Sequence, residues 1–470
     1  MNSNSKLLKN IFLMFLVYIL PKFFSFFLVP VYTAYLSTEE YGKADFIINI
    51  SCLLSPFVCL GMPSALLRFT IEDRNNNKPF QISLKITTLG SVLLLFTLFI
   101  IYVVDYISLD SFVFTFFIVT FSLISDIYIN YSRAEEKMKI ITICGVGSSF
   151  VGILCNILFI VVCNLGGKGF MLASVCSYAF NILVITFYTR NNNLYKGFFQ
   201  NSSKKLQLDM LKYSFPLIFS GLSWWIISSS DRFFVTWLCG SDANGLYSIA
   251  YKIPMIIQAL SNVFSLAWMY TLYDNYKTEE GRIYISRVIS LFNFIFLLVC
   301  SFLIMINKPL SKIMFSNEFY AAREFVPILL FSVAVNGSSN VVGALLSVYK
   351  KTKISMYISL IVCMCNIVFS CVFIQIFKGP IGAAIGTMIS FLIYCILNCV
   401  FGAKCSKVTI EWKLMFAIFS VVCFESINTT LEYNSWLNYV CLFTIIFLNL
   451  DSIILVKNNW KTLFYRSIKS

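Results

Sequence analysis

Hydrophobic runs of about 20 residues recur along the whole of this chain, from Ile11 to Val456. A bilayer hydrocarbon core of roughly 30 Å needs about 20 apolar residues in each helix that crosses it. With 59% hydrophobic residues, the 470 positions supply many such helices. The longest stretch without a convincing span, 189–214, is too short to bury a core of its own. The sequence therefore predicts an all-α, polytopic membrane protein with no appended catalytic domain.

The apolar runs predict twelve to fourteen spans. The first, Ile11–Leu36, is longer than a signal-peptide core and has no small-residue cleavage site, so we expect an uncleaved span. The run Leu414–Phe424 is the weakest because Glu425 ends it, but the basic segments on both sides of the last two runs require an even number of crossings. The spans begin near Ile11, Ala44, Ile82, Ser111, Ile140, Phe170, Phe215, Leu246, Ile283, Phe325, Ile354, Ile381, Leu414 and Leu437.

Lys and Arg residues crowd into alternate gaps between the runs, on the side that holds the N-terminus. The positive-inside rule then places the N- and C-termini in the cytoplasm. Topology accounts for the net charge of +14, so we expect membrane lipid and no nucleic acid as a partner. The cations assigned to the outer side are Lys43, Lys168, Lys308, Lys312, Arg323 and Lys378.

Cysteine and histidine usage excludes several classes of site. The 16 Cys residues lie mostly inside apolar runs, where Cys behaves as a small hydrophobic residue rather than as part of a disulfide framework. No CxxC motif occurs, and the chain has no His. The usual zinc and haem ligand sets and the Ser/His and Cys/His dyads are therefore missing. We expect no metal site, no catalytic residues and no enzyme activity.

A basic linker at 189–214 divides the chain into halves whose opening segments look alike, although the second copy is longer by eight residues. Two pseudo-symmetric six-helix lobes around a central cavity would give this pattern, as in many secondary transporters. We predict an N-terminal lobe at 1–188, a C-terminal lobe at 215–401, and two additional helices with a basic cytoplasmic tail at 402–470. The aligned pairs are Pro21 with Pro216, Ser25 with Ser220, and Gly42 with Gly245.

Ionisable residues deep in the spans are the main functional signal. A charge in hydrocarbon costs ~2.5 kcal/mol or more and usually faces a bundle interior or an aqueous cavity. Lys22 lies roughly 16 Å into the first span, near mid-bilayer. Pro21 beside it and Pro30 further on predict a kinked or interrupted helix. The alternative for Lys22 is a purely structural pair with a carboxylate.

The span from Phe215 has a polar stripe along one face, with Asp231 next to its last member. Such a stripe should line a cavity or a helix contact rather than lipid. The alternative for Asp231 and Arg232 is an interfacial anchor pair. Lys252 lies roughly 9 Å into the following span. The stripe consists of Ser220, Trp224, Ser228 and Arg232, at intervals of four.

Three further charges complete the candidates. Arg68 closes the second span, where a snorkelling anchor and a ligand contact are equally reasonable. Asp126 and Asp451 are the remaining deep carboxylates, and each could titrate, bind a cation or act as a plain counter-ion. Because four candidate cavity cations outnumber three deep Asp residues, an anionic cargo is favoured. Separately, the polar run Asn336–Asn340 in the tenth span predicts either an unwound hinge or polar interhelix packing.

Two segments, together with the layout of the spans, carry a resemblance to a known family. The first contains LSTEEYGKADF and LGMPSALLRF between Leu16 and Arg68, and the second is SSSDRFFVTWLCGSDANGLYSIAYKIP at Ser228–Pro254. The chain is similar, over most of its length, to the O-antigen and capsular polysaccharide repeat-unit flippases. These form the polysaccharide transporter branch of the multidrug/oligosaccharidyl-lipid/polysaccharide exporter superfamily. The resemblance implies two pseudo-symmetric lobes that work by alternating access.

The resemblance further implies that an undecaprenyl-diphosphate-linked oligosaccharide moves from the cytoplasmic to the outer leaflet of the bacterial cytoplasmic (inner) membrane. Coupling to H⁺ or Na⁺ and association with polysaccharide polymerase machinery are also compatible with it. By position, the cations that would engage the diphosphate or acidic sugars are Lys22, Arg68, Arg232 and Lys252. Because His is absent, the ion-coupling or counter-ion carboxylates would be Asp126, Asp231 and Asp451.

Several other functions remain open. A lipid II flippase or a teichoic-acid-type lipid-linked flippase would look similar, and a multidrug exporter of the same superfamily should have an acidic cavity. A membrane glycosyltransferase or polymerase would be an enzyme of similar hydropathy. Such enzymes typically carry a substantial outer loop, whereas the longest outer loop here, Asn307–Glu324, is short and has no adjacent acidic pair.

Overall fold

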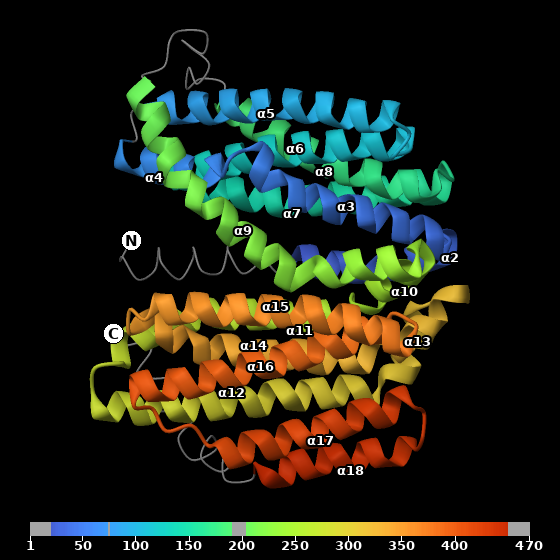
Figure 1. The fold of residues 1–470 in the computed structure, drawn as a ribbon, viewed down its shortest axis with the longest axis vertical. Helices are drawn as coiled ribbons and strands as arrows, with labels where there is room; N and C mark the ends of the chain where they lie inside the picture. Colours follow the sequence, from blue (N-terminus) through green and yellow to red (C-terminus); the bar gives the residue numbers. More distant parts are fainter. Residues whose placement is uncertain (1–19, 74–75, 190–203, 450–470) are drawn as a thin grey trace. The chain divides into compact units, whose positions relative to one another are not determined.

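The structure, a computed structural model, describes residues 20–73, 76–189 and 204–449. Within these ranges the chain forms helices and turns and contains no strand, which confirms the all-α prediction. Residues 11–19 of the first predicted span and the candidate Asp451 lie outside the described residues. The chain divides into two compact units, unit 1 at Met1–Ser248 and unit 2 at Ile249–Ser470 (Figure 1).

Unit 1 is a bundle in which α6 packs against α3, α4, α5 and α8, and in which α9 packs against α3 and α4. A core cluster that includes Leu66, Phe80, Ile127 and Ile185 joins α4, α5, α6 and α8. The helices are α2 (Val29–Tyr35), α3 (Thr38–Val58), α4 (Met62–Glu72), α5 (Lys78–Val103), α6 (Leu109–Ala134), α7 (Met138–Asn156) with the π-helical η1 (Ile157–Val162), α8 (Gly166–Thr189), α9 (Lys204–Cys239) and α10 (Ser241–Ala250), whose last two residues belong to unit 2.

Unit 2 is built around α14, which is the most deeply buried of its long helices and packs against α11, α12, α16 and α17. The helices are α11 (Pro254–Asn275), α12 (Glu279–Met305), α13 (Asn307–Met314), the 3₁₀ segment η3 (Asn317–Glu324), α14 (Val326–Val348), α15 (Thr352–Phe377), α16 (Ile381–Ser406), α17 (Trp412–Thr430) and α18 (Ser435–Leu448). The predicted outer loop Asn307–Glu324 is thus mostly helical.

Within the described residues, nine helices are long and apolar enough to cross a membrane. The bent pair α3 and α4 would make a tenth, and α18 is a shorter apolar helix. The helices begin close to the predicted starts because the apolar runs determine them. The nine are α5, α6, α7 with η1, α8, α12, α14, α15, α16 and α17.

The second predicted span is broken into α3 and α4, which meet at an angle of 50°. Gly61 has a left-handed backbone with φ +68, and Pro63 occupies the first turn of α4. A left-handed glycine ends a helix, and a proline is favoured at the start of the next one. Local sequence therefore accounts for the bend.

Two predictions about helix continuity can be compared with the structure. Residues 20–27 are helical, Leu28 is a turn, and α2 follows with Pro30 in its first turn, which confirms the predicted interruption of this helix. In contrast, α14 is continuous through Asn336–Asn340. The Ser339 hydroxyl accepts a bond of 2.9 Å from the Asn398 amide of α16, so interhelix packing, rather than an unwound hinge, accounts for this polar run.

Candidate functional site

The candidate site of unit 1 begins where α3 and α10 meet through two glycines. A Cβ at Gly42 would lie 1.9 Å from the Ser241 carbonyl oxygen, and one at Gly245 would lie 2.0 Å from the Thr38 carbonyl oxygen. No side chain fits at either position, so the two backbones are in direct contact. Gly42 and Gly245 are the pair aligned between the two halves of the sequence.

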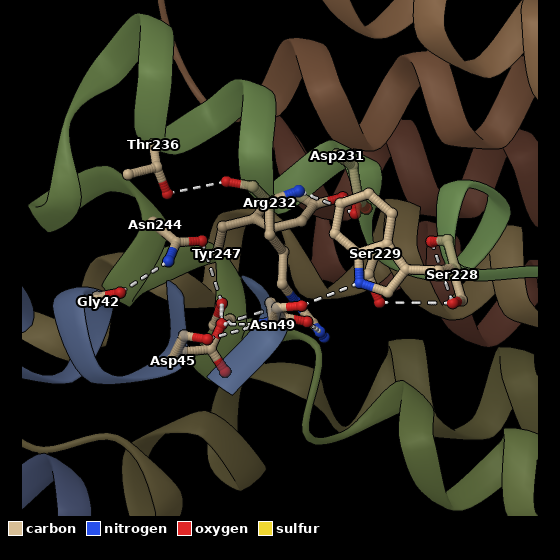
Figure 2. A network of polar contacts seen from close by, with 12 residues as sticks. Gly42, Asp45, Asn49, Ser228, Ser229, Asp231, Arg232, Thr236, Asn244 and Tyr247 are labelled. Atoms are coloured by element: carbon tan, nitrogen blue, oxygen red, sulfur yellow. Dashed lines mark hydrogen bonds and ion pairs between the residues drawn. The ribbon is translucent and has the colours of Figure 1, made fainter. Parts of the chain in front are cut away.

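Polar bonds surround this glycine contact. The Thr38 hydroxyl donates to Asp242 over 2.8 Å, and the Asn244 amide donates to the Gly42 carbonyl over 2.9 Å. The Ser248 hydroxyl donates to Asp45 Oδ2 over 2.7 Å. Asp45 and Ser248 each follow their glycine by three residues, so the contact joins positions that align in the sequence. Figure 2 shows the bond from Asn244 of α10 to Gly42 of α3.

Arg232 of α9 reaches across to α3, as Figure 2 shows. Its Nη1 donates to Asn49 Oδ1 over 3.4 Å, and its Nε lies 4.0 Å from Asp45 Oδ2. The Arg232 and Asp45 side chains are only 13% and 11% exposed. Asn49 is itself held by Trp225, whose indole donates to the Asn49 carbonyl over 3.0 Å, and by a 2.8 Å bond from its amide to Asp45. Two side chains of α3, those of Asp45 and Asn49, therefore contact the guanidinium.

Asp231 is buried and directed away from this guanidinium. Its Oδ2 accepts a 2.6 Å bond from the Tyr247 hydroxyl, and its Oδ1 accepts a 2.9 Å bond from the backbone N–H of Arg232. The carboxylate thus fixes α10 against the last turns of α9. Arg232 forms an ion pair with Asp45, a residue that the sequence-based predictions did not include.

Two more predicted residues lie on the same part of unit 1. Lys22 is exposed and is close enough to Arg232 for the two positive charges to repel. Asp126 of α6 is also exposed, and it interacts electrostatically with Cys52 of α3, which in turn interacts with Asp45 and Arg232. Lys22 and Arg232, together with Asp45 and Asn49, form one charged region, here called the unit 1 cluster, and Asp126 lies on the neighbouring α6.

The remaining predicted cations lie elsewhere. Arg68, near the end of α4, is exposed, forms an ion pair of 3.2 Å with Glu72 and covers the Tyr213 ring at 4.5 Å from its centroid. Lys252 is half-buried in the turn between α10 and α11, at the start of unit 2. The snorkelling alternative suits Arg68 best, because its partners lie on α4 and at the neighbouring α9.

The anionic cargo was predicted because the deep cations outnumbered the deep carboxylates. Two further buried carboxylates change this comparison. Asp45 lies in the unit 1 cluster, and Glu425 of α17 is completely buried in unit 2. With these two added, the deep carboxylates are no longer fewer than the deep cations. Asp45 and Asn49, four residues apart, form a polar pair on one helix face, and this spacing is the sequence signal that could have identified them.

The unit 1 cluster is suited to reversible anion binding. A planar guanidinium offers up to five donors and binds a carboxylate or a phosphate in the same forked geometry. At 4.0 Å the Asp45 carboxylate is at the limit of an ion pair rather than in a bidentate one. An incoming phosphate could therefore compete with Asp45 for Arg232, with Lys22 adding a second positive charge.

Comparisons with known proteins agree with this architecture. The family model described as "Polysaccharide biosynthesis protein" matches residues 7–270, more than half of the chain, and the MatE model matches residues 216–372. No curated protein matches the chain.

Solved structures with 14–15% sequence identity share the fold. A lipid II flippase, MurJ, in an inward closed conformation has 15% identity and a TM-score of 0.69, over 98% of this chain and 100% of that chain. An inward-facing multidrug resistance MATE family transporter of the MOP superfamily has 14% identity and a TM-score of 0.59, over 84% and 96%. A MOP superfamily transporter from Pyrococcus furiosus has 15% identity and a TM-score of 0.58, over 84% and 95%. The chain therefore belongs to the polysaccharide biosynthesis protein family and has the fold of the MurJ and MATE transporters, as the sequence predicted.

Proposed function

We propose that this protein is a flippase that moves an undecaprenyl-diphosphate-linked oligosaccharide, an O-antigen or capsule repeat unit, from the cytoplasmic to the outer leaflet of the bacterial inner membrane. Membership of the polysaccharide biosynthesis family supports a sugar-bearing cargo. The fold shared with a lipid II flippase supports a lipid-linked one. Association with polysaccharide polymerase machinery is part of this proposal.

The observation that carries the proposal is the guanidinium of Arg232 held within helices of the membrane domain, with Lys22 nearby. A diphosphate cannot cross hydrocarbon unaided, because a charge at the bilayer centre is costly. Cations that face a wet cavity would replace part of its hydration. In this scheme Arg232 and Lys22 bind the diphosphate first, and Arg68 and Lys252 contact the headgroup as it moves. Asp126, Asp231 or Asp451 would balance these charges or bind a coupling H⁺ or Na⁺.

The proposed mechanism is alternating access by two six-helix lobes, 1–188 and 215–401, joined by the segment 189–214 and followed by the accessory helices of 402–470. By the positive-inside rule, α3 begins and α9 ends at the outer side of the membrane. The contact of Gly42 with Gly245 then lies at that side and acts as an outer gate. The gate would open when phosphate draws Arg232 away from Asp45, and the polyprenyl chain would stay in lipid throughout.

A multidrug exporter is the second candidate. The carboxylates Asp45, Asp126 and Asp231 in and around the unit 1 cluster favour it, because acidic cavities suit cationic drugs. Other lipid-linked cargoes, lipid II or a teichoic-acid precursor, would use the same cations as an O-antigen unit.

Deletion of the gene tests the proposed function. We expect lipid-linked oligosaccharide to accumulate on the cytoplasmic leaflet, where externally added glycosidases cannot reach it, and surface polysaccharide to disappear. Complementation with the intact gene is the control. Accumulation of lipid II instead would identify the other lipid-linked cargo. Normal surface polysaccharide together with increased drug sensitivity would replace the proposal with the exporter.

A further inference from the structure

Unit 2 contains a buried acid that the proposed mechanism does not use. Glu425 lies on α17, which pairs with α18 and packs against α12 in Figure 1. The Glu425 residue is 0% exposed. It lies about 8 Å from the C-terminal end of a helix that is apolar enough to cross a membrane. Its carboxyl is therefore enclosed by helices at membrane depth.

The carboxyl of Glu425 lacks the partners that buried polar groups normally have. Among the described residues, neither Oε1 nor Oε2 has a hydrogen bond of good geometry, and the Ser301 hydroxyl of α12 lies close enough to interact with the carboxyl. Three residues further along α17, in contrast, the Asn428 amide donates to Asn438 of α18 over 2.8 Å. The Asn428 amide therefore has a partner on α18, whereas the Glu425 carboxyl does not have one there.

No cation compensates a charge on Glu425 within the described part of unit 2. The titratable groups near it are the thiols of Cys300 on α12 and Cys441 on α18, and α14 has no titratable residue. The η3 segment, which also packs against α17, carries Arg323, and this guanidinium is paired with Glu432 over 3.0 Å. Glu432 lies beyond the end of α17, about 10 Å along the helix direction from Glu425.

We propose that Glu425 is a proton-binding site that is loaded in the conformation described here and unloads during the transport cycle. An ionised carboxylate with no cation and only a neutral hydroxyl beside it would cost several kcal/mol, whereas a bound proton makes the group neutral. A role in packing alone would not require an acid, because two unpaired oxygens weaken the helix contact. Movement of α17 and α18 away from α12 would expose the acid to water and release the proton. This second step rests on the proposed transport function.

Chemical modification tests the first part of the proposal. Dicyclohexylcarbodiimide is lipophilic and reacts with protonated carboxyls: the acid O–H adds across one C=N bond, the oxygen bonds to carbon, and the proton moves to nitrogen. The resulting O-acylisourea rearranges to a stable N-acylurea. In membrane vesicles we expect this adduct on the peptide that contains Glu425 by mass spectrometry. A water-soluble carbodiimide should label that peptide at least about tenfold less.

Glu425→Gln should lose the adduct, and the exposed acid Glu432, which is paired with Arg323, should not acquire it. Absence of the adduct in the intact protein, or equal labelling by the water-soluble reagent, would overturn the proton site. Because labelling needs no cargo, this result is independent of the proposed function.

The transport step is tested by the pH dependence of flipping in proteoliposomes. An imposed pH gradient should stimulate the wild type and the control Glu432→Gln, whereas Glu425→Gln should flip lipid without responding to the gradient. An unchanged gradient response in Glu425→Gln would overturn the unloading step. Failure of the wild type to flip a lipid-linked oligosaccharide at all would instead refute the proposed function, and the labelling result would still decide whether the acid binds a proton.

Discussion

At the scale of single residues, the unit 1 cluster depends on a few polar side chains that each have more than one partner. Asp45 Oδ2 accepts from both Ser248 and Asn49 and also faces Arg232. Removing this shared acceptor breaks several interactions at once, which costs more than the loss of one bond. The cluster therefore has both a structural and a proposed functional role, and these can be separated by substitution.

Asp45→Ala is expected to destabilise the protein by about 1–3 kcal/mol, because the Ser248 hydroxyl and the Asn49 amide each lose a buried bond to the carboxylate. The hydroxyl keeps its bond to Asn244, and the amide keeps its bond to the Asp45 carbonyl. Thermal unfolding of the purified protein in detergent measures this. The control is Asp110→Ala, which removes an exposed pair with Lys168 of 2.9 Å that should contribute less than about 1 kcal/mol. Equal effects of the two substitutions would contradict the buried network.

Lys22→Ala and Arg232→Ala are expected to reduce export of the lipid-linked oligosaccharide by about tenfold or more, since each removes a cation from the proposed diphosphate site. Surface polysaccharide is measured at matched protein levels in the membrane. Lys168→Ala is the control: its ammonium is exposed and paired with Asp110 outside the unit 1 cluster, so we expect a much smaller loss. Normal export by both Lys22→Ala and Arg232→Ala would remove these side chains from the mechanism.

At the scale of helices, the start of α3 and the start of α10 form the contact on which alternating access would depend. Ser37 and Glu40 form a capping box that begins α3, and Gly240, with φ +90, separates α9 from α10. Gly42 lies in the first turns of α3 and Gly245 in the first turns of α10, and at these positions the two helices are in backbone contact. Such a contact can close one end of a cavity without bulky side chains.

A disulfide between Thr38→Cys and Asp242→Cys should lock this contact, because the two wild-type side chains are 2.8 Å apart. We expect the oxidised double variant to lose transport and a reductant to restore it, in a background without the exposed Cys52 and Cys163. Ser108→Cys with Ser111→Cys is the control pair, since it joins two positions within the first turn of α6, 2.9 Å apart, and ties no two helices together. Full transport with the α3–α10 disulfide formed would show that this contact does not open.

At the scale of the whole molecule, the sequence predicts the elements better than it predicts their partners. The starts of the long helices follow from apolar runs, and the interruption near Lys22 follows from Pro30, because both depend on nearby residues. The pairing of Arg232 with Asp45 joins residues far apart in the sequence, and no local pattern determines it. Glu425 likewise could not be predicted as a buried acid. In the sequence it only ends a weak apolar run, and its burial depends on packing of α17 against α12.

Contacts made by main-chain atoms alone have a mechanical consequence. Where Gly42 and Gly245 touch, no interlocked side chains must change rotamer before the helices part, so separation needs only a small sliding or tilting movement and the breaking of a few flanking hydrogen bonds. A contact between two backbones can form again in the same register after every transport cycle. A larger residue at either position would hold the two helices apart, so the molecule would favour the state in which the contact between α3 and α10 is open.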